Sequence, residues 1–280
     1  MFITQDQLDH YREDGFLFLP GCFSQSEVNA LKAELPAIYS DESHRRVVEK
    51  DGAIVRSVYG CHTRNEMFSR LSRHPRVVQP AIQILGSGVY VYQLKVNAKQ
   101  AFDGDVWDWH QDFVFWQQED GMASPRVINA AIFLDDVNEF NGPIFLIPGS
   151  HKEGVINGTP SHEVLNDPEL LPEAYKNSPN WISNLTATIK YSVDRDVVVR
   201  LASQHGIVSA MGPSGSMLLF HADIVHASPS NISPFSRAIV FISYNSVENI
   251  PSLKADARPD FLVGRDYEAI VPLREDTLAF

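Results

Sequence analysis

The amino-acid sequence predicts a mostly β protein whose sheets are flanked by helices. From Val89 onward, short runs of β-branched and aromatic residues are separated by Gly, Pro and Asn, which is the pattern of short strands joined by turns. Before Gly86, apolar residues instead recur at helical spacing behind capping residues. The chain has 280 residues, and β sandwiches and barrels of about 200 to 250 residues commonly form one domain. We therefore expect a single domain over residues 1–280.

A capping box predicts the first helix. Thr4 is followed three residues later by Gln7, so each side chain can cap a backbone N–H at the start of a helix. The helix should end at Gly15, because glycine readily adopts the left-handed conformation that follows a last helical turn. The apolar run over 16–19, closed by a proline, then predicts a strand.

A second capping box, formed by Ser24 and Glu27, predicts a helix that extends to about Tyr39. The charged stretch over 41–51 has no apolar period, so we expect an exposed loop there. Farther on, prolines punctuate an apolar stretch that predicts another helix ending at Gly86.

The second half of the chain supplies the strands. Six apolar runs predict them, over 89–98, 127–134, 143–147, 206–210, 216–220 and 237–244. The polar, weakly periodic segment 154–203 is a long insertion, and we expect partial helix there that covers the site as a lid. The tail after Pro251 is expected to be surface strand or coil.

Charge and cysteine content limit the partners of the protein. The formal net charge is −12, which argues against nucleic acid or an anionic membrane surface, since both attract basic proteins. A small-molecule substrate fits better. Two cysteines are too few for a disulfide scaffold, and no apolar leader is present. We expect a cytoplasmic protein, and the sequence makes no prediction of its oligomeric state.

The stretch WDWHQDFVFW, residues 107–116, carries the candidate chemistry. If it is a strand, His110 and Asp112 lie on one face, because side chains two residues apart point the same way. Two histidines and one carboxylate with open positions beside them are typical of non-heme Fe(II) oxygenases. His226, which follows the apolar run over 216–220, is the candidate for the second histidine. Arg237 begins the next predicted strand. Inside a barrel, its guanidinium could form two parallel hydrogen bonds with one carboxylate.

Three blocks around these residues resemble one enzyme family: WHQDFxxWQxEDGM over 109–122, FNGPIFLIPGSHK over 140–152 and HASPSNISPFSRAIVFISYNSVEN over 226–249. They are similar to the phytanoyl-CoA dioxygenase superfamily of Fe(II)/2-oxoglutarate oxygenases, and most closely to its ectoine hydroxylases. The resemblance implies a double-stranded β-helix, a jelly-roll or cupin-like core. It also implies Fe(II), 2-oxoglutarate and O₂ as reactants, with release of succinate and CO₂.

The resemblance also implies roles for individual residues. His110, Asp112 and His226 match the iron ligands. Those that match the 2-oxoglutarate site are Asn97, Ser228 and Arg237. Positions expected in the substrate pocket are Gln93, Phe115, Trp116, Asn129 and Phe241. His151 and His221 are expected to be structural, the latter because it would point to the opposite face of the strand that carries His226.

Departures from the ectoine hydroxylase pattern suggest a more apolar pocket. Val114 and Phe115 replace an acidic residue and a threonine, while Asn129 and Ala131 replace serines. A free amino acid with an aliphatic side chain therefore fits at least as well as an ectoine-like substrate. Three alternatives remain: a larger secondary metabolite, a non-catalytic cupin-like binding module, which predicts a broken ligand set, and a zinc hydrolase, which leaves Arg237 without a role.

Overall fold

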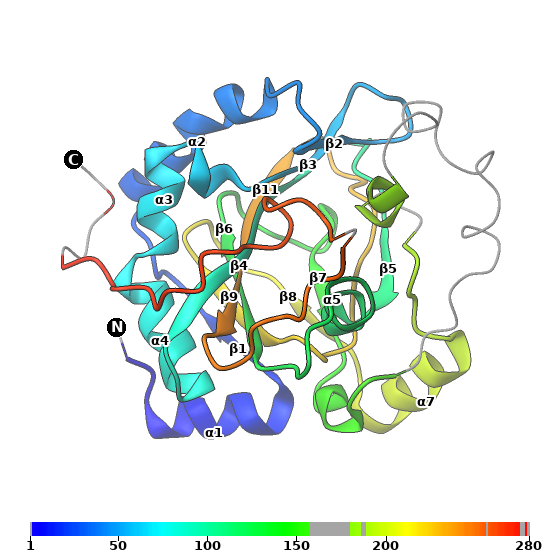
Figure 1. Cartoon of the computed structure of the whole chain (residues 1–280). Coiled ribbons are helices and arrows are strands. Elements are labelled where there is room, and N and C mark those ends of the chain that lie inside the picture. Colours follow the sequence, from blue (N-terminus) through cyan, green and yellow to red (C-terminus); the bar gives the residue numbers. More distant parts are fainter. Residues whose placement is uncertain (1, 157–179, 186–188, 256, 275–277, 279–280) are drawn as a thin grey trace.

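Two antiparallel sheets face one another in the computed structural model, which describes residues 2–156, 180–185, 189–255, 257–274 and 278 (Figure 1). The large sheet has the order β1-β9-β6-β11-β4-β3-β2 and the small sheet the order β5-β10-β7-β8. The strands are β1 (Phe16–Leu19), β2 (Arg46–Val48), β3 (Val55–Tyr59), β4 (Val89–Lys99), β5 (Trp107–His110), β6 (Val127–Phe133), β7 (Ile144–Leu146), β8 (Val208–Ala210), β9 (Met217–His221), β10 (His226–Ser228) and β11 (Arg237–Ser246).

From β4 to β11 the chain passes back and forth between the two sheets. β4, β6, β9 and β11 belong to the large sheet, and the strands between them belong to the small one. This alternation winds the chain into the double-stranded β-helix that the sequence predicted. The predicted mostly β class with flanking helices is confirmed.

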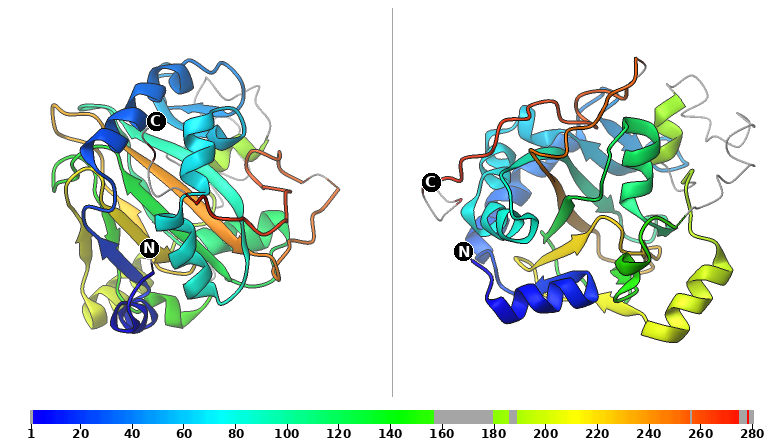
Figure 2. Two further views of the ribbon diagram at one scale, coloured as in Figure 1. Left: turned by 90° about the vertical axis from the view of Figure 1, so that its left-hand side faces the viewer. Right: turned by 60° about the horizontal axis from the view of Figure 1, so that its bottom comes forward.

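The first four helices lie along one side of the large sheet (Figures 1 and 2). They are α1 (Gln5–Asp14), α2 (Gln25–Tyr39), α3 (Glu66–Ser72) and α4 (Pro75–Leu85). Both predicted capping boxes are present, at Thr4 and at Ser24. Gly15 ends α1 with a φ of 82°, in the left-handed region that glycine adopts without strain.

Alternating side chains divide the large sheet into an outer and an inner face. On β4, Leu94 and Val96 pack with the helices in the main apolar core. Gln93, Lys95 and Asn97 point the other way and line a pocket between the sheets. The same alternation points polar side chains of β6 and β11 into this pocket. On each of these strands, the side chains that reach the pocket therefore lie on one face.

Several elements differ from the sequence prediction, among them β2 and α3. The stretch 41–51 is not wholly a loop, because β2 pairs with β3 and Val47 is fully buried. The charged residues on both sides of this short strand obscured its apolar pattern in the sequence. Helix α3 was not predicted, although Asn65 caps it by accepting a hydrogen bond from the Phe68 backbone N–H at 3.2 Å.

Five further helical elements complete the described part of the chain. They are the short 3-10 helices η1 (Cys61–Thr63), η2 (Ser150–Glu153) and η5 (Asn180–Leu185), and the helices α5 (Asp112–Asp120) and α7 (Arg195–His205). Of these, α5 and η5 contribute side chains to the pocket. Helix α7 confirms partial helix in the segment 154–203, while 157–179 and 186–188 lie outside the described residues. No helix in the described part of the chain has the length and apolar character that a membrane span requires.

The C-terminal tail is coil, as predicted, and most of its described residues are at least partly exposed, but a few of them are buried. Leu262 and Val263 are fully buried and pack with aromatic residues of α5 and β4. Arg258 is buried against Asp120 of α5. The tail therefore forms part of the wall around the pocket.

Candidate metal centre

His110, Asp112 and His226 converge between the two sheets. His110 ends β5, and Asp112 begins α5 one residue later, so the expectation of one continuous strand is wrong. The intervening Gln111 has an extended backbone (φ −117°, ψ 132°), and the chain turns into the helix only at Asp112. His226 starts β10 directly opposite His110 in the antiparallel pair. Strand pairing thus brings together two residues far apart in the sequence.

The geometry of the three side chains fits a metal ion. One ligand atom of each lies within 4.8 Å of those of the other two. His110 Nε2 is 3.7 Å from Asp112 Oδ1, and His226 Nε2 is 3.8 Å from Asp112 Oδ2. The two imidazole rings lie 4.1 Å apart between centroids.

Backbone carbonyls fix the tautomer of both histidines. His110 Nδ1 lies 2.6 Å from the carbonyl oxygen of Asp108, and His226 Nδ1 lies 3.0 Å from that of Ile224. A carbonyl oxygen only accepts, so each Nδ1 carries the proton. Each Nε2 therefore presents a lone pair to the space beside Asp112, as a metal-binding histidine requires.

The protonation states also suit metal binding. Burial lowers the pKa of His226 to about 4, with a further contribution from His110. Burial acts to raise the pKa of the Asp112 carboxyl, but His226, His110 and Lys95 outweigh it and hold that pKa below its ordinary value. Near neutral pH the cluster therefore offers the neutral imidazole of His226 and the Asp112 carboxylate, with His110 Nε2 facing the same carboxylate. The donor set fits a divalent metal of the facial two-histidine, one-carboxylate type.

One end of the pocket contains a buried guanidinium. Arg237 is 2% exposed, and its Nη2 donates to the carbonyl oxygen of Gly142 and, at 3.3 Å, to Ser228 Oγ. Within the described residues no carboxylate forms an ion pair with it. Burial lowers its pKa to about 10, so it stays charged at neutral pH. Asn97 Oδ1 also lines this end and has no hydrogen-bond partner in the described part of the chain. The three residues predicted to hold a co-substrate therefore lie together.

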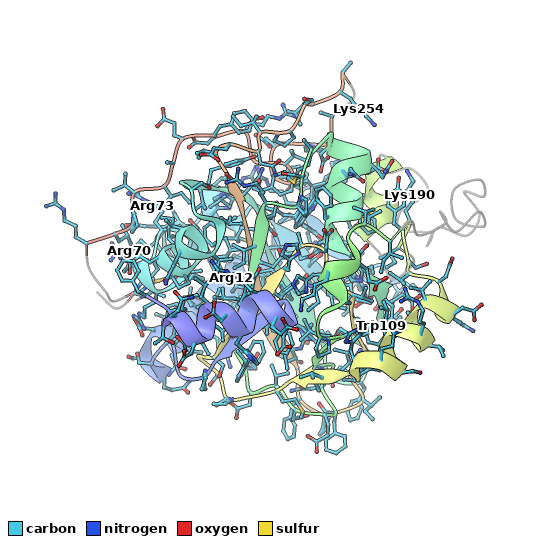
Figure 3. The ribbon with its side chains drawn as sticks, turned by 90° about the horizontal axis from the view of Figure 1, so that it is seen from below. Arg12, Arg70, Arg73, Trp109, Lys190 and Lys254 are labelled. Carbon is cyan, nitrogen blue, oxygen red and sulfur yellow. The ribbon has the colours of Figure 1, made fainter. Side chains whose placement is uncertain are left out.

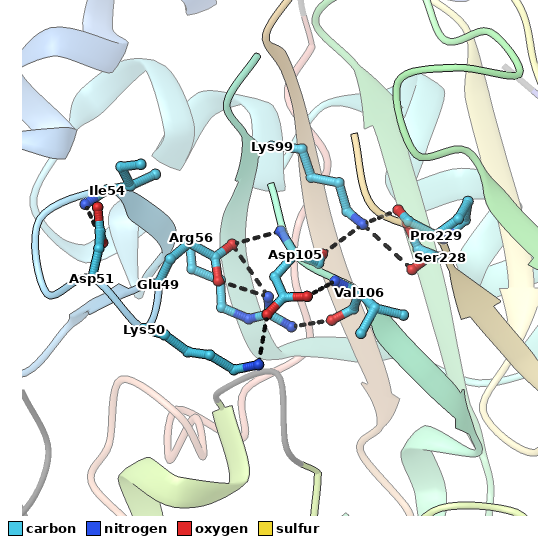
Figure 4. Close-up of polar contacts among 10 residues, drawn as sticks. All are labelled: Glu49, Lys50, Asp51, Ile54, Arg56, Lys99, Asp105, Val106, Ser228 and Pro229. Carbon is cyan, nitrogen blue, oxygen red and sulfur yellow. Dashed lines mark hydrogen bonds and ion pairs between the residues drawn. The ribbon is translucent and has the colours of Figure 1, made fainter. Parts of the chain in front are cut away.

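A buried polar network supports this end of the pocket (Figure 4). Arg56 donates to Glu49 at 3.1 Å, and Lys99 Nζ donates to the carbonyl oxygens of Asp105 at 2.8 Å and of Ser228 at 3.4 Å. Lys99 lies opposite Arg237 in the β4–β11 pair. The network holds the backbone after β10 in place. Sequence reasoning missed it, since its members are scattered over four segments.

The other part of the pocket is lined by aromatic, apolar and cationic side chains. Phe115 and Trp116 of α5 line it, together with Leu185 and Ile189 from the segment 154–203. The predicted residue Gln93 also lines it, and its Nε2 donates to the carbonyl oxygen of Leu262 at 2.8 Å.

Two cations in this part of the pocket were not predicted. The Lys95 ammonium lies 5.3 Å from the ring centroid of Phe241 and 5.4 Å from that of Trp107. Arg258 lines the same space, with Asp120 as its partner. Alternation along β4 could have pointed to Lys95, because it lies midway between two predicted pocket residues. No local pattern marks Arg258.

Other predicted pocket residues are placed differently. Val114 and Ala131 are buried but do not line the pocket, so they do not form its wall as the sequence comparison suggested. Asn129 does line the pocket, but its Nδ2 donates to Asp112 Oδ2 at 2.8 Å. Trp107 lines the pocket, whereas Trp109 packs with apolar residues of α7 (Figure 3).

His221 is not on the strand that carries His226. It ends β9 in the large sheet, whereas His226 starts β10 in the small one, so the reason given for its orientation is wrong. Its ring lies 5.2 Å from that of His151, and its Nδ1 accepts from the Asp223 backbone N–H at 3.0 Å. Both histidines thus have structural contacts.

Comparison with known proteins finds related enzymes over nearly the whole chain, among them the following two. An L-proline trans-4-hydroxylase of Streptomyces griseoviridis is 40% identical over 270 residues, which cover 96% of this chain and 95% of that protein. An ectoine dioxygenase of Bordetella bronchiseptica is 37% identical over 282 residues, covering 97% of this chain and 86% of that protein.

Structural comparison points the same way. The crystal structure of EctD from S. alaskensis with 2-oxoglutarate and 5-hydroxyectoine matches with a TM-score of 0.81 and 28% sequence identity, over 99% of this chain and 89% of that one. The sequence profile described as Phytanoyl-CoA dioxygenase (PhyH) matches residues 11–239. Taken with the relatives above, this match shows that the chain belongs to the phytanoyl-CoA dioxygenase family.

Proposed function

We propose that this protein is an Fe(II)- and 2-oxoglutarate-dependent dioxygenase that hydroxylates an unactivated C–H bond of a small amino acid. The observation that carries the proposal is the convergence of His110, Asp112 and His226 beside a buried arginine that has no carboxylate partner among the described residues. L-proline is the first candidate substrate, because a 40% identical relative is an L-proline trans-4-hydroxylase.

His110, Asp112 and His226 would hold the Fe(II). Their two imidazoles and one carboxylate leave the metal accessible from the pocket side, as this class of oxygenase requires. Bound together, Fe(II) and 2-oxoglutarate supply the oxidation: one atom of O₂ enters the substrate as a hydroxyl, the other enters succinate, and CO₂ is released.

Arg237 would pair the remote carboxylate of 2-oxoglutarate, with Ser228 and Asn97 beside it. A guanidinium matches a carboxylate in two parallel hydrogen bonds. Its burial makes such a pair strong, because the solvent that would screen it is excluded. The buried network at Arg56 and Lys99 keeps the backbone of Ser228 in place.

The substrate would occupy the part of the pocket lined by α5 and by Leu185 and Ile189. Lys95 gives this space positive charge, which suits the carboxylate of an amino acid, whereas the charge of Arg258 is offset by its partner Asp120. Phe115, Leu185 and Ile189 give it an apolar lining, which suits an aliphatic body. These last two residues also support a covering role for the segment 154–203, which would keep water away from the reacting carbon.

Ectoine is the second candidate substrate. A 37% identical relative is an ectoine dioxygenase, and ectoine likewise joins a carboxylate to a compact ring. Polar atoms of ectoine that face Phe115 would lose hydrogen bonds, at about 1 to 3 kcal/mol each. We therefore place it after L-proline.

Substrate-dependent succinate formation tests the proposal. The purified protein is incubated with Fe(II), 2-oxoglutarate, O₂ and one member of a panel that contains L-proline, aliphatic L-amino acids and ectoine. We expect succinate above the substrate-free rate and a product heavier by one oxygen. A second panel of coenzyme A thioesters and large polycyclic metabolites is run in parallel. Turnover confined to this second panel would contradict the small-amino-acid assignment, and the absence of 2-oxoglutarate consumption with either panel would contradict the oxygenase itself.

A further inference from the structure

We propose that Asn129, held in one orientation by Ser243, is a positioning residue that fixes the Asp112 carboxylate and leaves its Oδ1 atom for the metal. The inference rests on the proposed function, in that it takes His110, Asp112 and His226 to hold Fe(II). It assigns Asn129 to the support of a ligand rather than to contact with the substrate.

A chain of two hydrogen bonds ends on the carboxylate. Ser243 Oγ donates to Asn129 Oδ1 at 2.6 Å, and Asn129 Nδ2 donates to Asp112 Oδ2 at 2.8 Å. An ionised carboxylate only accepts hydrogen bonds, so the amide must turn its NH₂ group toward Asp112. Its oxygen then faces Ser243, whose hydroxyl can donate to it. The opposite orientation would set an amide oxygen against a carboxylate.

The two supporting residues are rigidly placed. Asn129 on β6 and Ser243 on β11 are direct partners in the antiparallel pair, and they are 1% and 5% exposed. Asp112 starts α5, outside both sheets. The hydrogen bond from Asn129 therefore ties a ligand at a helix start to the centre of the large sheet. Groups on paired strands hold a geometry better than groups on loops.

The contact distinguishes the two oxygens of Asp112. Oδ2 is engaged by the amide, whereas Oδ1 has no donor within hydrogen-bond distance among the described residues. Both oxygens lie at a similar distance from a histidine Nε2, but a metal bound to Oδ2 would compete with the Asn129 amide for that oxygen. The amide therefore favours ligation through Oδ1 alone, which keeps a metal position available for the co-substrate and O₂. Partners that orient metal ligands in this way are worth about 10- to 100-fold in metal affinity.

Asn129 has little capacity left for a substrate. Its oxygen is taken by Ser243, and one of its two N–H hydrogens is taken by Asp112. A substrate that recruited this amide would have to compete with a carboxylate for the same NH₂ group. The two roles therefore predict different effects of substitution.

Metal titration without turnover tests the inference. Co(II) is titrated into the anaerobic protein without 2-oxoglutarate, and its visible absorption gives both the affinity and a signature of the ligand set. We expect Asn129→Ala to weaken Co(II) binding about 10- to 100-fold and to change the absorption spectrum. Ser243→Ala should act in the same direction but less, because it frees the amide to rotate without removing it. Asn29→Ala, an exposed change in α2, is the control and should bind like the parent.

The outcomes separate the inference from the proposed function. If the unchanged protein and a His226→Ala variant bind Co(II) equally, the proposed metal centre is wrong, and the inference with it. If His226→Ala weakens Co(II) binding but Asn129→Ala and Ser243→Ala bind like the unchanged protein, the metal centre stands and the positioning role is overturned. A raised KM for the substrate at unaltered metal affinity would instead assign Asn129 to substrate contact. Should Asn129→Ala fail to fold, Ser243→Ala alone decides, and unchanged Co(II) binding by it overturns the inference.

Discussion

The carboxylate of Asp112 is the anionic member of the proposed ligand set. Replacing it with alanine removes the negative charge that offsets the metal and frees a coordination position. We predict that Asp112→Ala loses substrate-dependent succinate formation and binds Fe(II) at least 100-fold more weakly, since breaking a buried charged contact costs on the order of 3 kcal/mol or more. Anaerobic Fe(II) titration and a succinate assay measure both effects. Asp103→Ala, which removes an exposed carboxylate between β4 and β5, is the matched control, and equal losses in both variants would contradict the assignment.

Arg237 provides a second test at the scale of one residue. Because no carboxylate of the described chain lies within ion-pair distance of it, Arg237→Ala breaks no ion pair within the described part of the protein. Binding of 2-oxoglutarate should instead weaken roughly 100-fold or more, because its carboxylate would then be buried without a partner. Arg237→Lys keeps the positive charge but cannot form the bidentate pair, so its loss of 2-oxoglutarate affinity should be intermediate. Titration of 2-oxoglutarate into the anaerobic Fe(II) protein measures this, and equal affinity in all three proteins would refute the role.

At the scale of elements, the ion pair between Asp120 and Arg258 joins α5 to the C-terminal tail. The two contacts measure 2.8 and 2.6 Å, and both side chains are buried. We predict that Asp120→Asn lowers the free energy of unfolding by about 3 to 5 kcal/mol, because it leaves the guanidinium buried without its partner. Arg258→Met should cost a similar amount, and the double variant should cost less than the sum.

Urea unfolding of the three variants measures this coupling. The pair formed by Arg126 and Glu248 is a suitable control, since it also joins distant segments but is largely exposed, at 40% and 63%. Glu248→Gln should cost no more than about 1 kcal/mol. Additive losses at Asp120 and Arg258 would show that the pair does not hold the tail against α5.

At the scale of the whole molecule, one buried carboxylate connects two helices and the C-terminal end of the chain. Glu27 of α2 pairs with Arg76 of α4 and accepts from the backbone N–H of Leu278 at 3.1 Å. Burial acts to raise its pKa, but Arg76 and the backbone donors outweigh it and lower the pKa from 4.5 to about 2. The folded state thus binds the proton less readily than the unfolded chain. The resulting stabilisation, about 3 kcal/mol, is fully present above pH 4.5 and is lost as the pH falls toward 2.

Glu27→Gln should therefore flatten the acid side of the stability profile. Thermal unfolding between pH 2 and pH 7 measures the difference, which we expect to be largest above pH 4.5 and to vanish near pH 2. Glu139→Gln, which alters an exposed carboxylate, should keep the profile of the unchanged protein. If the stability of Glu27→Gln varied with pH in parallel with that of the parent, the pH dependence assigned to Glu27 would be contradicted.

The sequence by itself determined what depends on local order. The capping boxes at Thr4 and Ser24, the glycine stop at Gly15 and the period-two runs identified helices and strands, because these signals act within a few residues. The blocks around His110 and His226 identified the family, and with it the reactants. Where a local signal was weak or misleading, as at β2 or at the turn from His110 into α5, prediction from sequence was wrong.

Only the tertiary structure decided which distant residues meet. Pairing of β5 with β10 sets His110 opposite His226, and pairing of β6 with β11 sets Asn129 opposite Ser243. Lys95 and Arg258 reach the same pocket from segments more than 150 residues apart. Such contacts follow from sheet register and from burial of the tail, which are set by the packing of the whole chain and leave no periodic pattern in the sequence.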